Sequence, residues 1–133
     1  MGIMSNALSI ASTGLTADSA MLSITANNLA NAQTVGTATT PAYASESVVM
    51  QALPAHHGLG QGVEVTGIVT DPAPGPITYD PASPFANAQG DVVGTNVSTA
   101  DQMANMLEAS TAYSANVTAF NAAKAIDQRA LTI

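Results

Sequence analysis

The chain has 133 residues, a length that suits one domain, and only 8% of them are charged, against about a quarter in typical proteins. Its net charge is −7, and the two basic residues, Lys124 and Arg129, lie close together near the end of the sequence. Nucleic-acid binding needs several clustered basic residues to displace counterions, so this composition excludes a nucleic-acid partner. The low charge predicts instead a surface that protein partners cover.

A first helix is predicted over residues 1–32. Its leucines share a strict seven-residue interval and are Leu8, Leu15, Leu22 and Leu29. This spacing is typical of a helix that packs against another helix. The apolar pattern is interrupted, because the positions three residues after the first three leucines hold Ala11, Asp18 and Thr25 rather than large apolar side chains. In addition, Gly14 costs about 1 kcal/mol inside a helix. We therefore expect the helix to depend on one main partner surface.

The start of the chain does not resemble a targeting segment. It lacks the basic residues and the continuous apolar stretch of a secretory signal, and no apolar run in the chain is long enough to span a membrane. We expect no cleavable signal peptide and no direct membrane insertion. If the protein is exported, another route carries it.

The middle of the chain, residues 33–96, has a different composition, because all seven prolines lie there. Two Val-containing segments, 47–53 and 62–69, are predicted as strands of a small antiparallel sheet, and Gly67 indicates a bulge in the second. The segment 71–76 contains three prolines and predicts a stiff extended turn. The sequence thus indicates a short Pro/Gly-rich β module.

A second long helix is predicted over residues 97–133, with Ser98 or Thr99 as its N-cap and Asp101 favourable in the first turn. One face is bulky and carries Met103, Met106, Tyr113, Val117, Phe120 and Leu131. Another face is mostly alanine and carries Ala109, Ala112, Ala119, Ala123, Ile126, Ala130 and Ile133. Two apolar faces exceed what one helix can cover, so we expect several neighbours. The predicted fold class is mainly α with a small β-rich middle, in which the long terminal helices form an antiparallel coiled-coil-like pair that flanks the β module.

One segment, Ala-Asn-Asn-Leu-Ala-Asn-Ala-Gln-Thr-Val-Gly at 26–36, resembles the signature of the bacterial flagellar rod and hook family. Further matches to the proximal rod type of that family are Tyr79, Pro81, Pro84, Ala86, Gly90, Asn96, Val97, Met103, Met106, Ser110, Tyr113, Asn116, Val117, Asn121 and Lys124. The sequence departs from the family pattern where 37–40 intervene before Pro41 and where Ala44 and Ser45 replace a basic pair. These departures leave open a specialised rod paralogue.

The resemblance implies a structural subunit of the proximal rod of the flagellar basal body, and no enzymatic activity or cofactor. It implies that the terminal helices polymerise with other rod proteins and with copies of the same chain, as part of the drive shaft around the export channel. It also implies passage through the flagellar export apparatus and a location in the rod, periplasmic after export. An alternative that the residues alone leave open is a small secreted binding or adhesion module that uses the Pro/Gly-rich middle.

Asparagines near the helix ends have a physical interpretation. Asn27, Asn28 and Asn31 can satisfy the free carbonyls at a helix C-terminus, and Asn116 and Asn121 can hydrogen-bond across a helix interface and set its register. The residues that we predict for the assembly interface are Leu8, Leu15, Leu22, Leu29, Asn28, Asn31, Met103, Met106, Tyr113, Asn116, Val117, Phe120 and Leu131.

No catalytic, metal or cofactor site is predicted. His56 and His57 are adjacent, so on an extended chain they point in different directions, and they are interpreted as loop residues between the two strands rather than as ligands of a metal hydrolase. Asp71, Asp80 and Asp91 each lie among Pro or Gly residues, where aspartate is favoured because it caps the backbone of its own turn.

Overall fold

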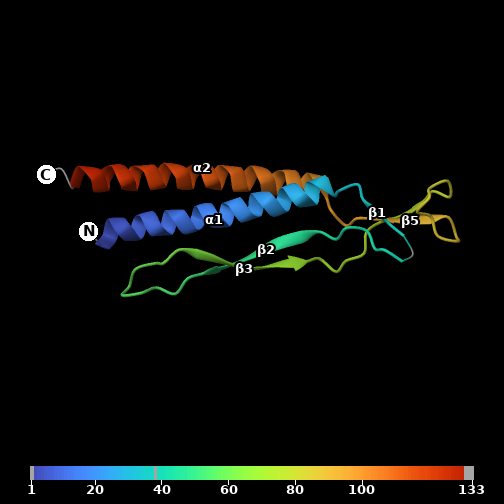
Figure 1. The fold of residues 1–133 in the computed structure, drawn as a ribbon, viewed down its shortest axis with the longest axis horizontal. Coiled ribbons are helices and arrows are strands. Elements are labelled where there is room, and N and C mark those ends of the chain that lie inside the picture. The colour runs from blue at the N-terminus through green and yellow to red at the C-terminus, as the bar shows by residue number, and fades with distance from the viewer. Residues whose placement is uncertain (1, 38, 131–133) are drawn as a thin grey trace.

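The computed structural model describes residues 2–37 and 39–130. Two long helices dominate it, α1 (Gly2–Ala30) and α2 (Thr99–Ala130). They lie side by side and antiparallel, so that the start of α1 and the end of α2 are at the same end of an elongated molecule (Figure 1). The predicted fold, mainly α with a small antiparallel β middle, is confirmed.

The two predicted strands form a hairpin that runs along α1 (Figure 1). They are β2 (Glu46–Ala52) and β3 (Val63–Thr70), paired antiparallel. Val49 lies opposite Gly67 whereas the next residue, Met50, lies opposite Val65, so the register shifts there. The predicted bulge is therefore confirmed. The main partner of α1 within the chain is α2, as expected of a helix with one main partner surface, and α1 also packs against this hairpin.

A second small sheet was not predicted. It has the strand order β1 (Val35–Gly36), β5 (Asp91–Gly94) and β4 (Ile77–Tyr79), with both pairs antiparallel. It lies at the opposite end of the molecule from the start of α1 (Figure 1). The expected extended turn at 71–76 is confirmed, since it contains no strand and leads from the hairpin into this sheet.

The seam between the helices contains small and polar side chains. The buried residues of α1 other than Ala17, which lies beside the hairpin, are Ala11, Asp18, Thr25 and Asn28, and those of α2 are Gln102, Ala109 and Ala123. They include the residues three positions after Leu8, Leu15 and Leu22. The four leucines of the seven-residue row are all partly exposed and flank the seam. Small side chains allow two helices to approach closely, and this closeness displaces the larger leucines to the sides.

Both helix ends are capped by residues that the sequence singled out. The Ser98 hydroxyl accepts a hydrogen bond from the Asp101 backbone N–H at 3.3 Å, so Ser98 is the N-cap of α2. At the end of α1, the Asn31 backbone N–H donates to the carbonyls of Asn27 and Asn28, both at 3.1 Å. Within the described part of the chain, neither helix is long and apolar enough to cross a membrane.

Candidate assembly interface and the junctions that shape it

Asn28 is the most completely buried large side chain of the described residues, with 1% of its surface exposed. Its amide nitrogen donates to the Glu46 carbonyl at 2.7 Å and to the Gln102 Oε1 atom at 3.0 Å. Its amide oxygen accepts from the Glu46 N–H at 2.9 Å and from the Tyr43 hydroxyl at 2.8 Å. Both donor hydrogens and both acceptor sites of this side chain are therefore used. Asn28 thereby joins α1, the start of β2 and α2, and we call this cluster the Asn28 junction.

Asn31 makes its hydrogen bonds to residues that are near it in the sequence. Its amide nitrogen donates to the Asn27 carbonyl at 2.9 Å and to Asn27 Oδ1 at 3.2 Å, while its carbonyl accepts from the N–H and the hydroxyl of Thr34. The Thr34 hydroxyl in turn accepts from the Tyr43 N–H at 3.3 Å. The expected satisfaction of the helix C-terminus is confirmed for Asn31, and the turn after α1 is fixed by it.

Asn116 forms a polar contact across the helix seam. Its amide nitrogen donates to Asp18 Oδ2 at 2.8 Å, from α2 to α1. The contact depends on Gly14, because a Cβ atom there would lie 2.6 Å from Asn116 Nδ2. The glycine that is unfavourable for an isolated helix thus makes room for the asparagine. Asn121 is exposed and makes no side-chain hydrogen bond to the residues that the structure describes.

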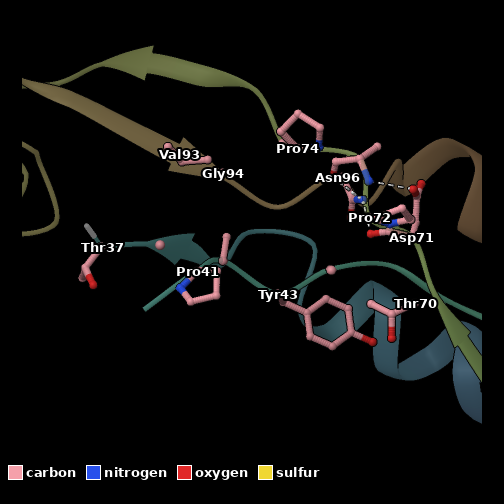
Figure 2. A pocket seen from close by; sticks show the side chains of 15 residues that line it. Thr37, Pro41, Tyr43, Thr70, Asp71, Pro72, Pro74, Val93, Gly94 and Asn96 are labelled. Atoms are coloured by element: carbon pink, nitrogen blue, oxygen red, sulfur yellow. Dashed lines mark hydrogen bonds between the residues drawn. The ribbon is translucent and has the colours of Figure 1, made fainter. Parts of the chain in front are cut away.

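Asn96 joins the hairpin to the segment that enters α2. Its Oδ1 atom accepts from the Ser45 N–H at 2.7 Å, and its nitrogen donates to the carbonyls of Ala73 at 2.9 Å and Asp71 at 3.2 Å. A hollow of about 520 Å³ lies beside it, with Pro41 and Tyr43 on one side and the proline-rich segment 71–75 on the other (Figure 2). Most of its lining residues are glycine, alanine, proline or threonine, and Tyr43 and Asp71 are its acid–base groups.

The outward faces of α2 carry apolar side chains that the other described residues leave exposed. Met103 is 57% exposed and Leu107, one helical turn further on, is 72% exposed. Tyr113 and Ile126 are also exposed. Of the other α2 residues predicted for the interface, Met106, Val117 and Phe120 are partly exposed. Leu131 lies outside the described residues.

Leu107 was not predicted as an interface residue, although it lies four positions after Met103, on the same helix face. That i, i+4 spacing was a usable signal. By contrast, Asn28, Asn31 and Asn116 make their hydrogen bonds within the chain. Their role, and that of the leucines, at an interface between subunits stays a prediction.

The histidines lie at the exposed tip of the hairpin. His56 forms an isolated bridge with Leu59, and His57 has a φ of 50°. The two imidazole rings meet edge to face with centroids 4.1 Å apart. Their interpretation as loop residues is confirmed. Among the described residues there is no group of three or more His, Cys, Asp or Glu side chains that could hold a metal ion.

Asp71, Asp80 and Asp91 were interpreted as residues that cap the backbone of their own turns, and this is confirmed for Asp71 and Asp80. Asp71 Oδ1 accepts from the Ala73 N–H at 2.9 Å, and Asp80 Oδ1 accepts from the Ala82 N–H at 3.2 Å, as expected for turns. For Asp91 it was wrong, because this residue begins β5 and pairs with Tyr79.

The side chain that caps the turn before Asp91 belongs instead to Asn87. Its Oδ1 atom accepts from the N–H groups of Gln89 and Asp91, both at 2.9 Å. Residues 87–91 therefore form a turn around the Asn87 amide. Asp91 itself already belongs to the β4–β5 pair.

Tyr43 gives the Asn28 junction a pH dependence. Burial raises the pKa of the Tyr43 phenol above its ordinary value of about 10, and the nearby Glu46 carboxylate adds to the rise. Above about pH 10 the unfolded chain loses this proton before the folded chain does, so the free energy of unfolding falls as the pH rises from the unfolded towards the folded pKa.

We expect Tyr43→Phe to lower the free energy of unfolding at neutral pH by about 1 kcal/mol, because the hydrogen bond to Asn28 is lost. The variant should also lose the part of the alkaline destabilisation that Tyr43 causes. Denaturant titrations at about pH 8 and about pH 11 measure both effects. An equal alkaline loss in the two proteins would show that Tyr43 is not the titrating group.

Known families match both ends of the chain. The family model described as flagella basal body rod protein matches residues 8–36, which include Asn28 and Asn31. The model described as flagellar basal body rod FlgEFG protein C-terminal matches residues 88–133, which include α2.

Relatives are similar over nearly the full length. The flagellar basal-body rod protein FlgC of Escherichia coli is 36% identical over 128 residues, 96% of each chain. FlgC of Borreliella burgdorferi is 34% identical over 150 aligned positions, which cover 100% of this chain and 98% of the relative. FlgC of Salmonella typhimurium is 34% identical over 128 residues, 96% of each chain. The resemblance inferred from the motifs is confirmed, and the chain belongs to the family of the flagellar basal-body rod protein FlgC.

Proposed function

We propose that this chain, a structural subunit of the flagellar basal-body rod and not an enzyme, is held in the rod by its two terminal helices. The observation that carries this proposal is the uncovered apolar surface of α2, where Met103 and Leu107 are more than half exposed. The seam with α1 is already closed by other residues, so these side chains are available to neighbouring subunits. The family assignment favours this function over a small secreted binding module.

The energetic argument is that burial of these side chains stabilises the assembly. Complete burial of one Met or Leu side chain contributes about 1.5–3 kcal/mol. The partly exposed leucines of α1 offer a second such surface on the other helix. Contacts of this size, repeated in every subunit, add to the stability of a polymer.

In the rod, the terminal segments 1–32 and 97–133 form an inner, coiled-coil-like helical layer around the export channel, and 33–96 form a separate β-rich module. The subunit belongs to the proximal part of the drive shaft and contacts other rod proteins and copies of itself. It reaches its periplasmic position through the flagellar export apparatus. The antiparallel helix pair and its uncovered faces support this arrangement, because an inner layer needs helices with apolar surface on more than one side.

A pair of methionine variants tests the proposal. Met103→Gln changes an exposed side chain of α2, and Met50→Gln makes the same change in the hairpin, where the side chain is 39% exposed. In a strain that lacks its own copy of this rod protein, we expect Met103→Gln to reduce swimming and the amount of protein in purified basal bodies severalfold. The loss of about 1.4 kcal/mol at each contact weakens that contact tenfold.

Met50→Gln should support nearly normal swimming, and both variants should unfold at the same temperature as the original chain. Normal rods with Met103→Gln would contradict the proposed role of this α2 surface. A defect in both variants alike would show that the contacts are not specific to the helices.

A further inference from the structure

Met103 is the most exposed of the methionines whose side chains the structure describes. It is 57% exposed, whereas Met50 in the hairpin is 39% exposed and Met21 and Met106 are both partly buried. The sulfur of a methionine is oxidised when an oxidant in solution can reach it. Met103 is therefore the described methionine that such an oxidant reaches most readily, and it also lies on the α2 surface that the proposed function assigns to neighbouring subunits.

The helix around Met103 gives its sulfur no aromatic partner. The positions one helical turn away hold Thr99, Ala100, Met106 and Leu107, and none of these is aromatic. A ring at one of these positions would be near enough to hold the sulfur in a sulfur–aromatic contact. Without such a ring on the helix, the thioether is open to solvent in the free subunit.

Hydrogen peroxide is the simplest reagent of the class that this site would take. The sulfur lone pair attacks one peroxide oxygen, and an S–O bond forms as the O–O bond breaks. The proton of the attacked oxygen passes to the departing oxygen, which leaves as water. Sulfur is oxidised by two electrons and the peroxide is reduced by two. The product, methionine sulfoxide, is polar where the thioether was apolar.

We propose that Met103 is an oxidation site that controls entry of the subunit into the rod, because the thioether permits the contact of α2 with its neighbours and the sulfoxide prevents it. Burial of the sulfoxide oxygen at an apolar contact removes its hydrogen bonds to water. The effect on assembly is then of the same kind as that of Met103→Gln. The inference rests on the proposed function, because it presumes that this surface is buried in the rod, and it adds a chemical regulation of that surface.

A competition between two chains in the same cells tests the exclusion of the oxidised subunit. The original chain and Met103→Leu are expressed together in a strain that lacks its own copy of this rod protein, with and without hydrogen peroxide in the medium. Leucine preserves the apolar character and approximate volume of the side chain but cannot form a sulfoxide. Mass spectrometry gives the ratio of the two chains in purified basal bodies and in the whole lysate.

We expect peroxide to lower the share of the original chain in basal bodies, relative to the lysate, by the fraction of lysate chains that carry the sulfoxide at Met103. Each ratio is divided by the ratio without peroxide, so an effect of the substitution itself cancels. The matched control pairs the original chain with Met50→Leu, which leaves Met103 in place, and that ratio should not change. An unchanged ratio with Met103→Leu, while the lysate contains the sulfoxide at Met103, would overturn the proposal. A lysate in which Met50 is oxidised and Met103 is not would overturn it as well.

A second measurement separates this inference from the proposed function. Purified chain and purified basal bodies are treated with the same concentration of hydrogen peroxide, and the sulfoxide at each methionine is quantified. We expect Met103 to react in the free chain and severalfold more slowly in basal bodies, whereas Met50 reacts in both. Equal reaction of Met103 in the two samples would contradict the proposed function and this inference together. Protection of Met103 in basal bodies combined with an unchanged competition ratio would overturn only the control by oxidation.

Discussion

Replacement of Asn28 by alanine is expected to lower the free energy of unfolding by about 3 kcal/mol, the largest effect of any single polar substitution in this chain. The reason is that the Asn28 amide makes four hydrogen bonds with no access to water. Its removal leaves the N–H and carbonyl of Glu46 and the Gln102 Oε1 atom without their partner, and buried polar groups left unpaired cost about 1–3 kcal/mol each before the structure relaxes. Chemical denaturation followed by circular dichroism measures the change.

Asn121→Ala is the matched control. It makes the same substitution on a helix, but Asn121 is exposed and its side chain has no hydrogen bond to the described residues. The free energy of unfolding should change by less than about 0.5 kcal/mol. An equal effect of the two substitutions would mean that the Asn28 junction does not hold the hairpin and the helices together.

Gly14→Ala is expected to lower the free energy of unfolding by about 2 kcal/mol, although alanine is intrinsically better in a helix by about 1 kcal/mol. The new Cβ atom would lie 2.6 Å from Asn116 Nδ2, so the asparagine has to move away. Asp18, which is only 8% exposed, then loses its hydrogen bond across the seam. Thermal unfolding of the variant measures the balance.

A triple variant separates the clash from other effects. Gly14→Ala combined with Asn116→Ala and Asp18→Ala removes both the clash and the buried polar pair, so most of the lost stability should return. The seam would then consist of small apolar side chains, which still permit close approach. A single Gly14→Ala variant more stable than the original chain would contradict this explanation.

The features that follow from local chemistry were predictable from the sequence. The leucine spacing predicted α1, Ser98 indicated the start of α2, and Gly67 indicated the bulge in β3. The second sheet was missed because its strands are two to four residues long and their pairing joins distant segments, for example Val35 with Gly94. Segments of this length carry too few side chains to show a period.

The helix seam shows a second limit of prediction from the sequence pattern. A hydrophobic pattern favours the leucines as the packed residues, but the helices meet through Ala11, Asp18 and Thr25 instead. The cause is a close approach that depends on the pair Gly14 and Asn116, which come from opposite ends of the sequence. A pattern within one helix contains no information about that distance.

The candidate site was predictable only in part, because its contacts also join segments that are distant in the sequence. The motif around Asn28 identified the residue, but its partners Glu46, Gln102 and Tyr43 became apparent only when three elements were brought together. Exposure on α2 likewise identified Leu107, which composition alone does not distinguish from a core leucine.

Electron cryomicroscopy of basal bodies that contain this chain tests the central claim most directly. If the terminal helices hold the subunit in the rod, Met103 and Leu107 on the outward face of α2 will be buried against neighbouring subunits in the density map. If both side chains face solvent and the subunit is held only through the hairpin, the claim is contradicted.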